Sequence, residues 1–222
     1  MTDGRSSVMI QYKKDELMTK PVNRKEEILK IARNLFLTKD YEKTTMLDIM
    51  DALEIAKGTI YHYFKSKEAL FEAVIEDIVE ENIKQMSTLI KNSSKSALEK
   101  IQLLVNGGNI SQENEKIVEQ LHKPVNDALH SRLLAAALMK QAPLYAEIIQ
   151  QGCDEGLFVT RAPLECAEFI LSAIQFLTDK GIYPWKEEDL KRRIQAFPAL
   201  IEQMLQAPPG SFQFLKCKFQ EN

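Results

Sequence analysis

The most informative stretch of the sequence is KGTIYHYFKSKEAL, which runs from Lys57 to Leu70. Its first residues favour a short helix, because Ile60 and Phe64 lie one helical turn apart and form an apolar side. Between Lys57 and Lys67 there are three lysines and no acidic residue, although the whole chain has a net charge of −3. A small basic segment of this kind lets an acidic protein bind a polyanion while its bulk stays soluble.

Two more helices are expected directly upstream. Asn23 is a suitable N-cap for the first, whose apolar stripe repeats at helical spacing and fades near residues 38–40. Thr45-Met-Leu-Asp48 has the form of a capping box and opens a second, short helix. A short helix, a tight turn and another short helix describe a helix-turn-helix, a unit that places its second helix in the major groove of DNA.

The side chains of this unit suit nucleic acid. Lysines offset phosphate charge, and hydroxyl, phenol and imidazole groups reach phosphates or base edges. A glycine near a helix start lets two backbones approach closely, and threonines at a helix N-terminus can donate to phosphate. The candidate DNA contacts are Thr44, Thr45, Lys57, Gly58, Thr59, Tyr61, His62, Tyr63 and Lys67.

Over residues 24–75 the sequence closely resembles the DNA-binding domain of TetR-type bacterial transcription regulators. The resemblance rests on the stretch from Lys57 to Leu70, on the preceding pair Thr44 and Thr45, and on the Leu-Phe-Leu helix before them. Farther along, the segment from Gly152 to Phe158 is similar to a Gly-x-x-Glu-Gly-x-Phe element of that family. The resemblance implies a homodimeric regulator, most often a repressor, that a small hydrophobic effector releases from a near-palindromic operator.

The resemblance also assigns roles to single residues. It implies phosphate contacts for Thr45 and Lys67, base-edge contacts for Gly58 and Thr59, and backbone contacts for Tyr61, His62 and Tyr63. The turn departs from the family pattern Ala-Gly-Val-Ser and reads Leu-Glu-Ile-Ala from residue 53 to residue 56. Glu54 thus takes a position where glycine is common, because φ can be positive there, and brings an acid near the DNA. A rival hypothesis is therefore an interaction module that kept the fold and lost operator binding.

The rest of the chain predicts an all-α fold, in which the helix-turn-helix unit is joined to a larger C-terminal helical bundle. Residues 1–67 carry a net charge of +3, and residues 68–222 carry −6. Prolines divide the later helices: Pro143 is expected to open a new helix and Pro198 to kink or divide another. The expected organisation is an irregular leader (1–20), a DNA-binding domain (21–67), a ligand-binding and dimerisation domain (68–206), and a tail (207–222).

The resemblance implies two further sites in the C-terminal domain. Helices at about 163–179 and 186–206 would pair with their symmetry mates in a homodimer through the apolar residues Leu164, Phe169, Ile170, Ala173, Phe176, Ile194, Phe197, Leu200, Ile201 and Leu205. A ligand cavity would lie among the later helices and a long fourth helix, for which Ser66 is a suitable N-cap. Its candidate lining residues are Met86, His122, Met139, Tyr145, Gln175 and Phe176.

Other classes of function find little support. An enzyme needs a reactive constellation, and no Ser/His/Asp or Cys/His arrangement and no phosphate-binding Gly loop stands out. His122 and His130 are eight residues apart and lack a recognisable third ligand, so no metal site and no cofactor are predicted. Three cysteines without CxxC spacing fit a reduced, cytoplasmic protein. No apolar run is long enough to predict a membrane span.

Overall fold

A computed structural model describes residues 23–91, 93–107, 116–117, 119–123 and 126–218. Every regular element in these ranges is helical, as the sequence predicts. The chain divides after Val74 into two compact units. The predicted leader over residues 1–20 lies outside the described residues.

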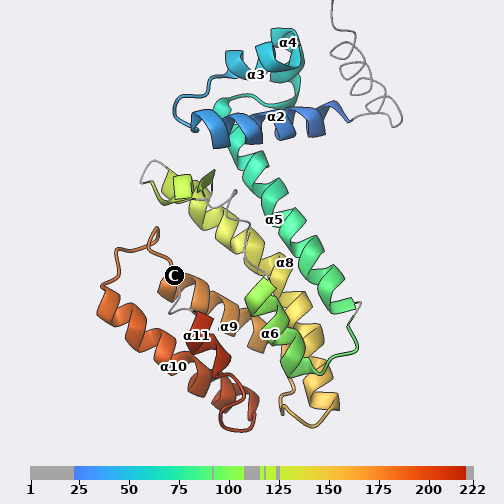
Figure 1. The fold of residues 1–222 in the computed structure, drawn as a ribbon, viewed down its shortest axis with the longest axis vertical. Helices are drawn as coiled ribbons and strands as arrows, with labels where there is room; N and C mark the ends of the chain where they lie inside the picture. Colours follow the sequence, from blue (N-terminus) through green and yellow to red (C-terminus); the bar gives the residue numbers. More distant parts are fainter. Residues whose placement is uncertain (1–22, 92, 108–115, 118, 124–125, 219–222) are drawn as a thin grey trace, which may run out of the picture. The chain divides into compact units, whose positions relative to one another are not determined.

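The first unit contains α2 (Arg24–Lys39), α3 (Met46–Leu53), α4 (Lys57–Tyr63) and the start of α5 (Lys67–Lys91) (Figure 1). Its core includes the rings of Phe36, Tyr41 and Phe71, whose centroids lie 4.3 to 5.7 Å apart. Since Leu70 and Phe71 are fully buried in this unit, the first turns of α5 belong to it. The division therefore falls within α5 and not after Lys67, where the sequence placed it.

The predicted helix starts carry the expected caps. The Asn23 side chain accepts a hydrogen bond from the amide of Lys25, and Thr45 and Asp48 form a complete capping box. At the start of α5, the hydroxyl of Ser66 accepts a hydrogen bond from the amide of Ala69. These side chains satisfy amide groups that have no partner within their own helix.

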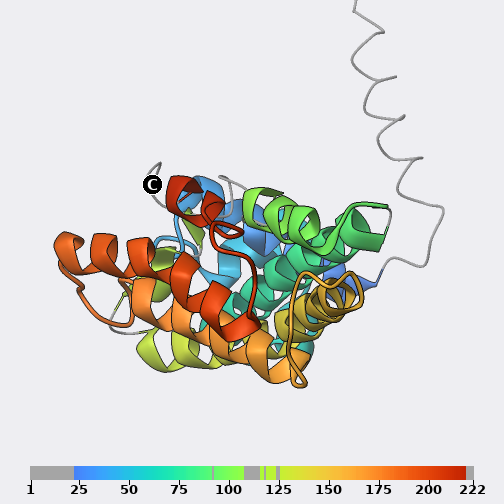
Figure 2. The same ribbon diagram turned by 90° about the horizontal axis from the view of Figure 1, so that it is seen from below.

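The second unit holds the rest of α5 together with α6 (Ala97–Gly107), η1 (Glu119–His122), α8 (Asp127–Asp154), α9 (Pro163–Thr178), α10 (Glu187–Leu205) and α11 (Phe214–Lys218). Within it, α9 lies between α8 and α10 (Figures 1 and 2). Buried apolar side chains from α5, α6, α8, α9, α10 and α11 form one continuous core. This unit is the helical bundle that the sequence predicts.

Two prolines lie inside continuous helices. Pro143 lies inside α8, which runs unbroken from Asp127 to Asp154 instead of forming two helices. Its ring is exposed while the flanking Ala142 and Leu144 are buried, so core packing on one side holds the helix together. Pro198 likewise lies inside a continuous α10 and does not divide it.

The segment from Gly152 to Phe158 ends α8 as expected. Gly156 has φ of 73°, and the amides of Leu157 and Phe158 both donate to the carbonyl oxygen of Gly152. The Phe158 ring packs directly on Gly152, where an added Cβ would collide with it. The two glycines thus allow the turn and the close approach that bury Phe158.

The tail after residue 206 belongs to the bundle. The sequence predicts a loose segment as far as Phe212, but the side chains of Phe212 and Leu215 are buried. The amide of Phe212 donates to the buried carboxylate of Glu202 at 3.0 Å. These contacts anchor α11 on α10 and α6.

Candidate nucleic-acid interface and effector cavity

The turn between α3 and α4 is tight and left-handed at one residue. Glu54 has φ of 52° and ψ of 43°, and the amide of Ile55 donates to the carbonyl oxygen of Met50 at 3.1 Å. Ala56 then precedes α4 with an extended backbone. The glycine-like geometry expected at residue 54 is therefore present although the residue is a glutamate.

Helix α4 has one buried side and one accessible side. Ile60 and Phe64 are buried in the core, whereas Lys57, Gly58, His62 and Tyr63 are exposed and Thr59 and Tyr61 are half-buried. The Lys57 ammonium lies 5.7 Å from the centroid of the Tyr61 ring, and the rings of His62 and Tyr63 meet edge to face. The accessible side thus gathers a cation, hydroxyl groups and an imidazole.

Gly58 stands at the start of this accessible side. An added Cβ there would meet no heavy atom of the described chain within 4 Å, and its φ is not positive. Nothing in the described protein therefore requires glycine at this position. Glycine does, however, let another molecule approach the backbone of α4 closely.

The two threonines before α3 differ in accessibility. The hydroxyl of Thr44 is fully buried and donates to the carbonyl oxygens of Asp40 at 2.7 Å and Leu35 at 3.3 Å. The prediction that this hydroxyl donates to phosphate is therefore wrong. Thr45 is exposed, but its hydroxyl and amide both donate to Asp48.

Two lysines connect separate segments of the first unit through their ammonium groups. The Lys39 ammonium lies 2.7 Å from the Asp48 carboxylate, and with the Thr45 donors it lowers the pKa of Asp48 to about 2. The Lys67 ammonium donates to the carbonyl oxygens of Tyr41 and Glu42 and lies 4.3 Å from the centroid of the Tyr41 ring. Lys67 therefore joins the start of α5 to the loop before α3. Its phosphate contact stays a prediction.

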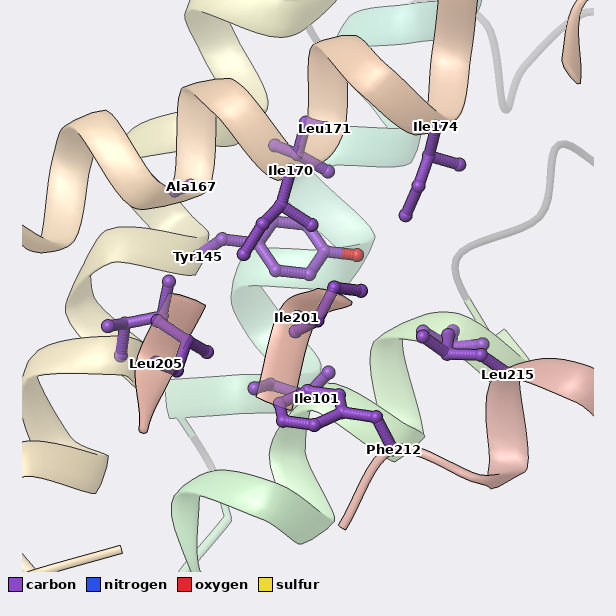
Figure 3. A pocket seen from close by; sticks show the side chains of 12 residues that line it. Ile101, Tyr145, Ala167, Ile170, Leu171, Ile174, Ile201, Leu205, Phe212 and Leu215 are labelled. Atoms are coloured by element: carbon purple, nitrogen blue, oxygen red, sulfur yellow. The ribbon is translucent and has the colours of Figure 1, made fainter. Parts of the chain in front are cut away.

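An apolar cavity of about 60 Å³ lies inside the second unit (Figure 3). Tyr145 from α8 points its hydroxyl into it, and burial raises the pKa of that hydroxyl to about 12. The other lining side chains are hydrocarbon, from α6, α8, α9, α10 and the tail: Ile101, Val105, Ile149, Ala167, Ile170, Leu171, Ile174, Ile201, Leu205, Phe212 and Leu215. The cavity thus combines an apolar wall with a single hydrogen-bonding group.

The six predicted pocket residues do not line one common cavity. Only Tyr145 lines the cavity, while Gln175 and Phe176 line a second hollow of about 240 Å³ between α8 and α9. Met86 is buried in the core, whereas Met139 is 65% exposed, and neither residue lines either of these two hollows. His122 instead lies beside His130 and Asp179.

Some residues of the predicted dimer face are exposed, whereas others are buried in the core. Leu164, Phe169 and Phe176 of α9 and Leu200 of α10 are exposed, with Phe169 63% exposed. Phe197, Ile201 and Leu205, which were expected on the same face, are buried within the chain's own core. Those three residues are therefore not available to a second copy.

No helix in the part of the chain that the structure describes is both long enough and apolar enough to cross a bilayer. The described fold instead joins a helix-turn-helix unit, with a polar and basic side on its second helix, to a separate helical bundle. This combination defines a class of protein, the helix-turn-helix transcription regulators.

Comparison with known proteins specifies the family. The model for bacterial regulatory proteins of the TetR family matches residues 28–74, and the model for the tetracyclin repressor-like C-terminal domain matches residues 109–200. The chain belongs to the TetR family. It is a DNA-binding transcription regulator and not an enzyme.

Individual relatives are distant. The chain is 26% identical over 202 residues to the uncharacterized regulator YfiR of Bacillus subtilis, which covers 83% of this chain and 93% of YfiR. It is 26% identical over 144 residues to the transcriptional repressor KstR2 of Mycolicibacterium smegmatis, covering 63% of this chain and 70% of KstR2. The solved structure of a transcriptional regulator from Cytophaga hutchinsonii superposes with a TM-score of 0.58 at 23% identity, covering 82% of this chain and 98% of that one. That likeness supports the fold alone.

Proposed function

We propose that this chain is a cytoplasmic, homodimeric repressor that binds a near-palindromic operator and leaves it when a small hydrophobic effector binds. The observation that carries the proposal is the two-sided helix α4. Its buried residues Ile60 and Phe64 fix it to the unit, while its accessible side offers Lys57, Gly58 and Tyr61 outward. In the proposed complex this side enters the major groove, with His62, Tyr63 and Thr59 beside it.

Phosphate contacts come from the flanks of that helix. Lys57 and Lys65 supply charge, and the N-terminus of α3 adds the partial positive charge of its helix dipole. Thr45 contributes by holding that turn in place through Asp48, and its hydroxyl can donate to a phosphate oxygen when it releases Asp48 as its acceptor. Lys67 acts mainly by fixing the loop before α3, with its remaining ammonium proton directed to phosphate.

The dimer explains the exposed apolar side chains on α9 and α10. Phe169, Phe176, Leu164 and Leu200 would be buried against a second copy in a four-helix interface through residues 163–179 and 186–206. Two helix-turn-helix units then read two half-sites about one helical turn, or roughly 34 Å, apart.

The apolar cavity supports a hydrophobic effector that carries one hydrogen-bonding group for Tyr145. Its volume of about 60 Å³ is far below the roughly 300–1,000 Å³ of a typical ligand site. An effector must therefore open the cavity by moving α9, α10 or the tail. A ligand that binds only the opened form shifts the equilibrium toward that form, which is the differential affinity that release from DNA requires.

Selection of duplexes from a random DNA pool tests the proposal, because it needs no assumption about the operator sequence. We expect enrichment of a near-palindrome whose half-sites are centred about one helical turn apart. The exposed acid Glu54 in the turn favours one rival, an interaction module that has lost operator binding. That rival would be favoured if no sequence is enriched and if the affinity for DNA is weak and does not change with salt concentration.

A further inference from the structure

Two histidines and one aspartate that are distant in the sequence meet in the second unit. His122 ends η1, His130 lies in the first turns of α8, and Asp179 follows α9. His130 Nε2 lies 3.0 Å from Asp179 Oδ2, and His122 Nε2 lies 3.7 Å from Asp179 Oδ1. One ligand atom from each residue lies within 4.8 Å of the other two. The histidine pair can be recognised in the sequence, but its third partner, Asp179, cannot.

The carboxylate is held in place by the backbone. Asp179 Oδ1 accepts hydrogen bonds from the amides of Gly181 at 2.7 Å and Ile182 at 3.2 Å. Gly181 also packs closely against both imidazoles, since an added Cβ there would collide with the rings of His122 and His130. The loop after α9 thus fixes the aspartate and limits the movement of both rings.

The cluster is buried on one side and open on the other. His130 is only 4% exposed, whereas the side chain of His122 is 41% exposed and that of Asp179 13% exposed. An ion can therefore reach the three ligand atoms from the side of His122 without unfolding the bundle. None of these residues lines the apolar cavity.

We propose that His122, His130 and Asp179 form an open, three-ligand site for a divalent transition-metal ion of the Zn²⁺ type. Imidazole is a ligand of borderline softness, and two imidazoles with one carboxylate suit Zn²⁺ and Co²⁺, while Ca²⁺ and Mg²⁺ favour sites made only of oxygen. Three protein ligands leave coordination positions for water or a small anion. The two amides on Asp179 are outer partners that orient a metal ligand.

Metal binding changes the hydrogen bonding of the cluster in a defined way. The Nε2 atom of His130 faces Asp179, and coordination through this atom requires the neutral ring that carries its proton on Nδ1. The direct contact between the two residues is then replaced by one bond from each residue to the ion. The ion also ties η1, the start of α8 and the loop after α9 together, so it stabilises the folded chain as it binds.

The test uses tag-free, full-length protein that has been treated with a chelator and then titrated with Co²⁺, followed by visible absorption. Zn²⁺ is added afterwards to displace the Co²⁺. We expect one Co²⁺ per chain and complete displacement. Because His122 is partly exposed, His122→Gln keeps the fold, and Asp179→Asn keeps an oxygen for the two amides. Each variant should weaken Co²⁺ binding at least about tenfold, with unchanged helical circular dichroism.

Two controls distinguish this site from other metal binding. His62→Gln removes the remaining histidine, which lies in the first unit, and should leave the Co²⁺ affinity unchanged. The combined variant Cys153→Ser, Cys166→Ser and Cys217→Ser removes every thiol and should also leave it unchanged. Equal affinity in the wild type and in His122→Gln, or loss of binding in the cysteine variant alone, would overturn the proposal.

Discussion

Thr45 and Asp48 cap each other at the N-terminus of α3: the Asp48 amide donates to Thr45 Oγ1 at 3.1 Å, and the Thr45 amide donates to Asp48 Oδ2 at 2.8 Å. This pair fixes the first helix of the helix-turn-helix. Thr45→Ala should lower the free energy of unfolding by about 1 kcal/mol, because an amide of the first turn loses its acceptor. Thr45→Ser keeps the hydroxyl and serves as the matched control. Urea denaturation measures both, and equal stability of the two variants would show that the cap contributes nothing.

The same pair predicts a dependence of stability on pH. The ion pair with Lys39 and the bonds from Thr45 lower the pKa of Asp48 from 3.8 to about 2 in the folded protein. Because the folded pKa lies below the unfolded value, the stabilisation is complete above about pH 4 and is lost as the pH falls through 2. The difference in stability between the wild type and Asp48→Asn should therefore shrink as the pH falls from about 4 to about 2. Acid titration of both proteins in urea measures it, and a constant difference would contradict this account.

Glu54 predicts opposite responses to two substitutions. Its φ of 52° is strained for a residue with a side chain, so Glu54→Gly should stabilise the first unit by about 1 kcal/mol. Glu54→Gln keeps the backbone strain and removes only the negative charge, so it should tighten DNA binding without added stability. Thermal unfolding and DNA titration separate the two effects. Stabilisation by Glu54→Gln as large as by Glu54→Gly would mean that charge, and not backbone geometry, is the cost.

The exposed phenylalanines of α9 predict the oligomeric state. Phe169→Glu should convert a dimer into a monomer, since it places a charge in the centre of the proposed interface. Leu89→Glu on α5 makes the same change at another exposed apolar residue and should leave the dimer intact. Sedimentation equilibrium distinguishes the two masses. A wild-type protein that sediments as a monomer would contradict the dimer.

The local parts of this fold could be predicted from the sequence. The caps at Asn23, Thr45 and Ser66 depend on residues close together in the chain. The accessible side of α4 follows from the spacing of Ile60 and Phe64. These features could be found because helical periodicity and capping are local signals.

The features that the sequence did not reveal depend on tertiary packing. Thr44 is polar and lies next to an accessible threonine, yet the fold buries it against α2. The cavity draws its walls from five segments, so each lining residue resembles an ordinary core residue in the sequence. Asp179 joins His122 and His130 only because the loop after α9 returns to the start of α8. The sequence signals for that cluster are the pair His122 and His130 and an aspartate, Asp179, in a later loop.

Fluorescence anisotropy on DNA from directly upstream of the gene, at physiological salt, tests operator recognition through α4. Wild-type protein should bind this duplex at least about 10³-fold more tightly than a scrambled duplex, and Tyr61→Ala should abolish the preference. Tyr183→Ala, which removes an exposed tyrosine of the second unit, should keep it. A wild-type preference for the upstream duplex that persists undiminished in Tyr61→Ala would contradict recognition through α4.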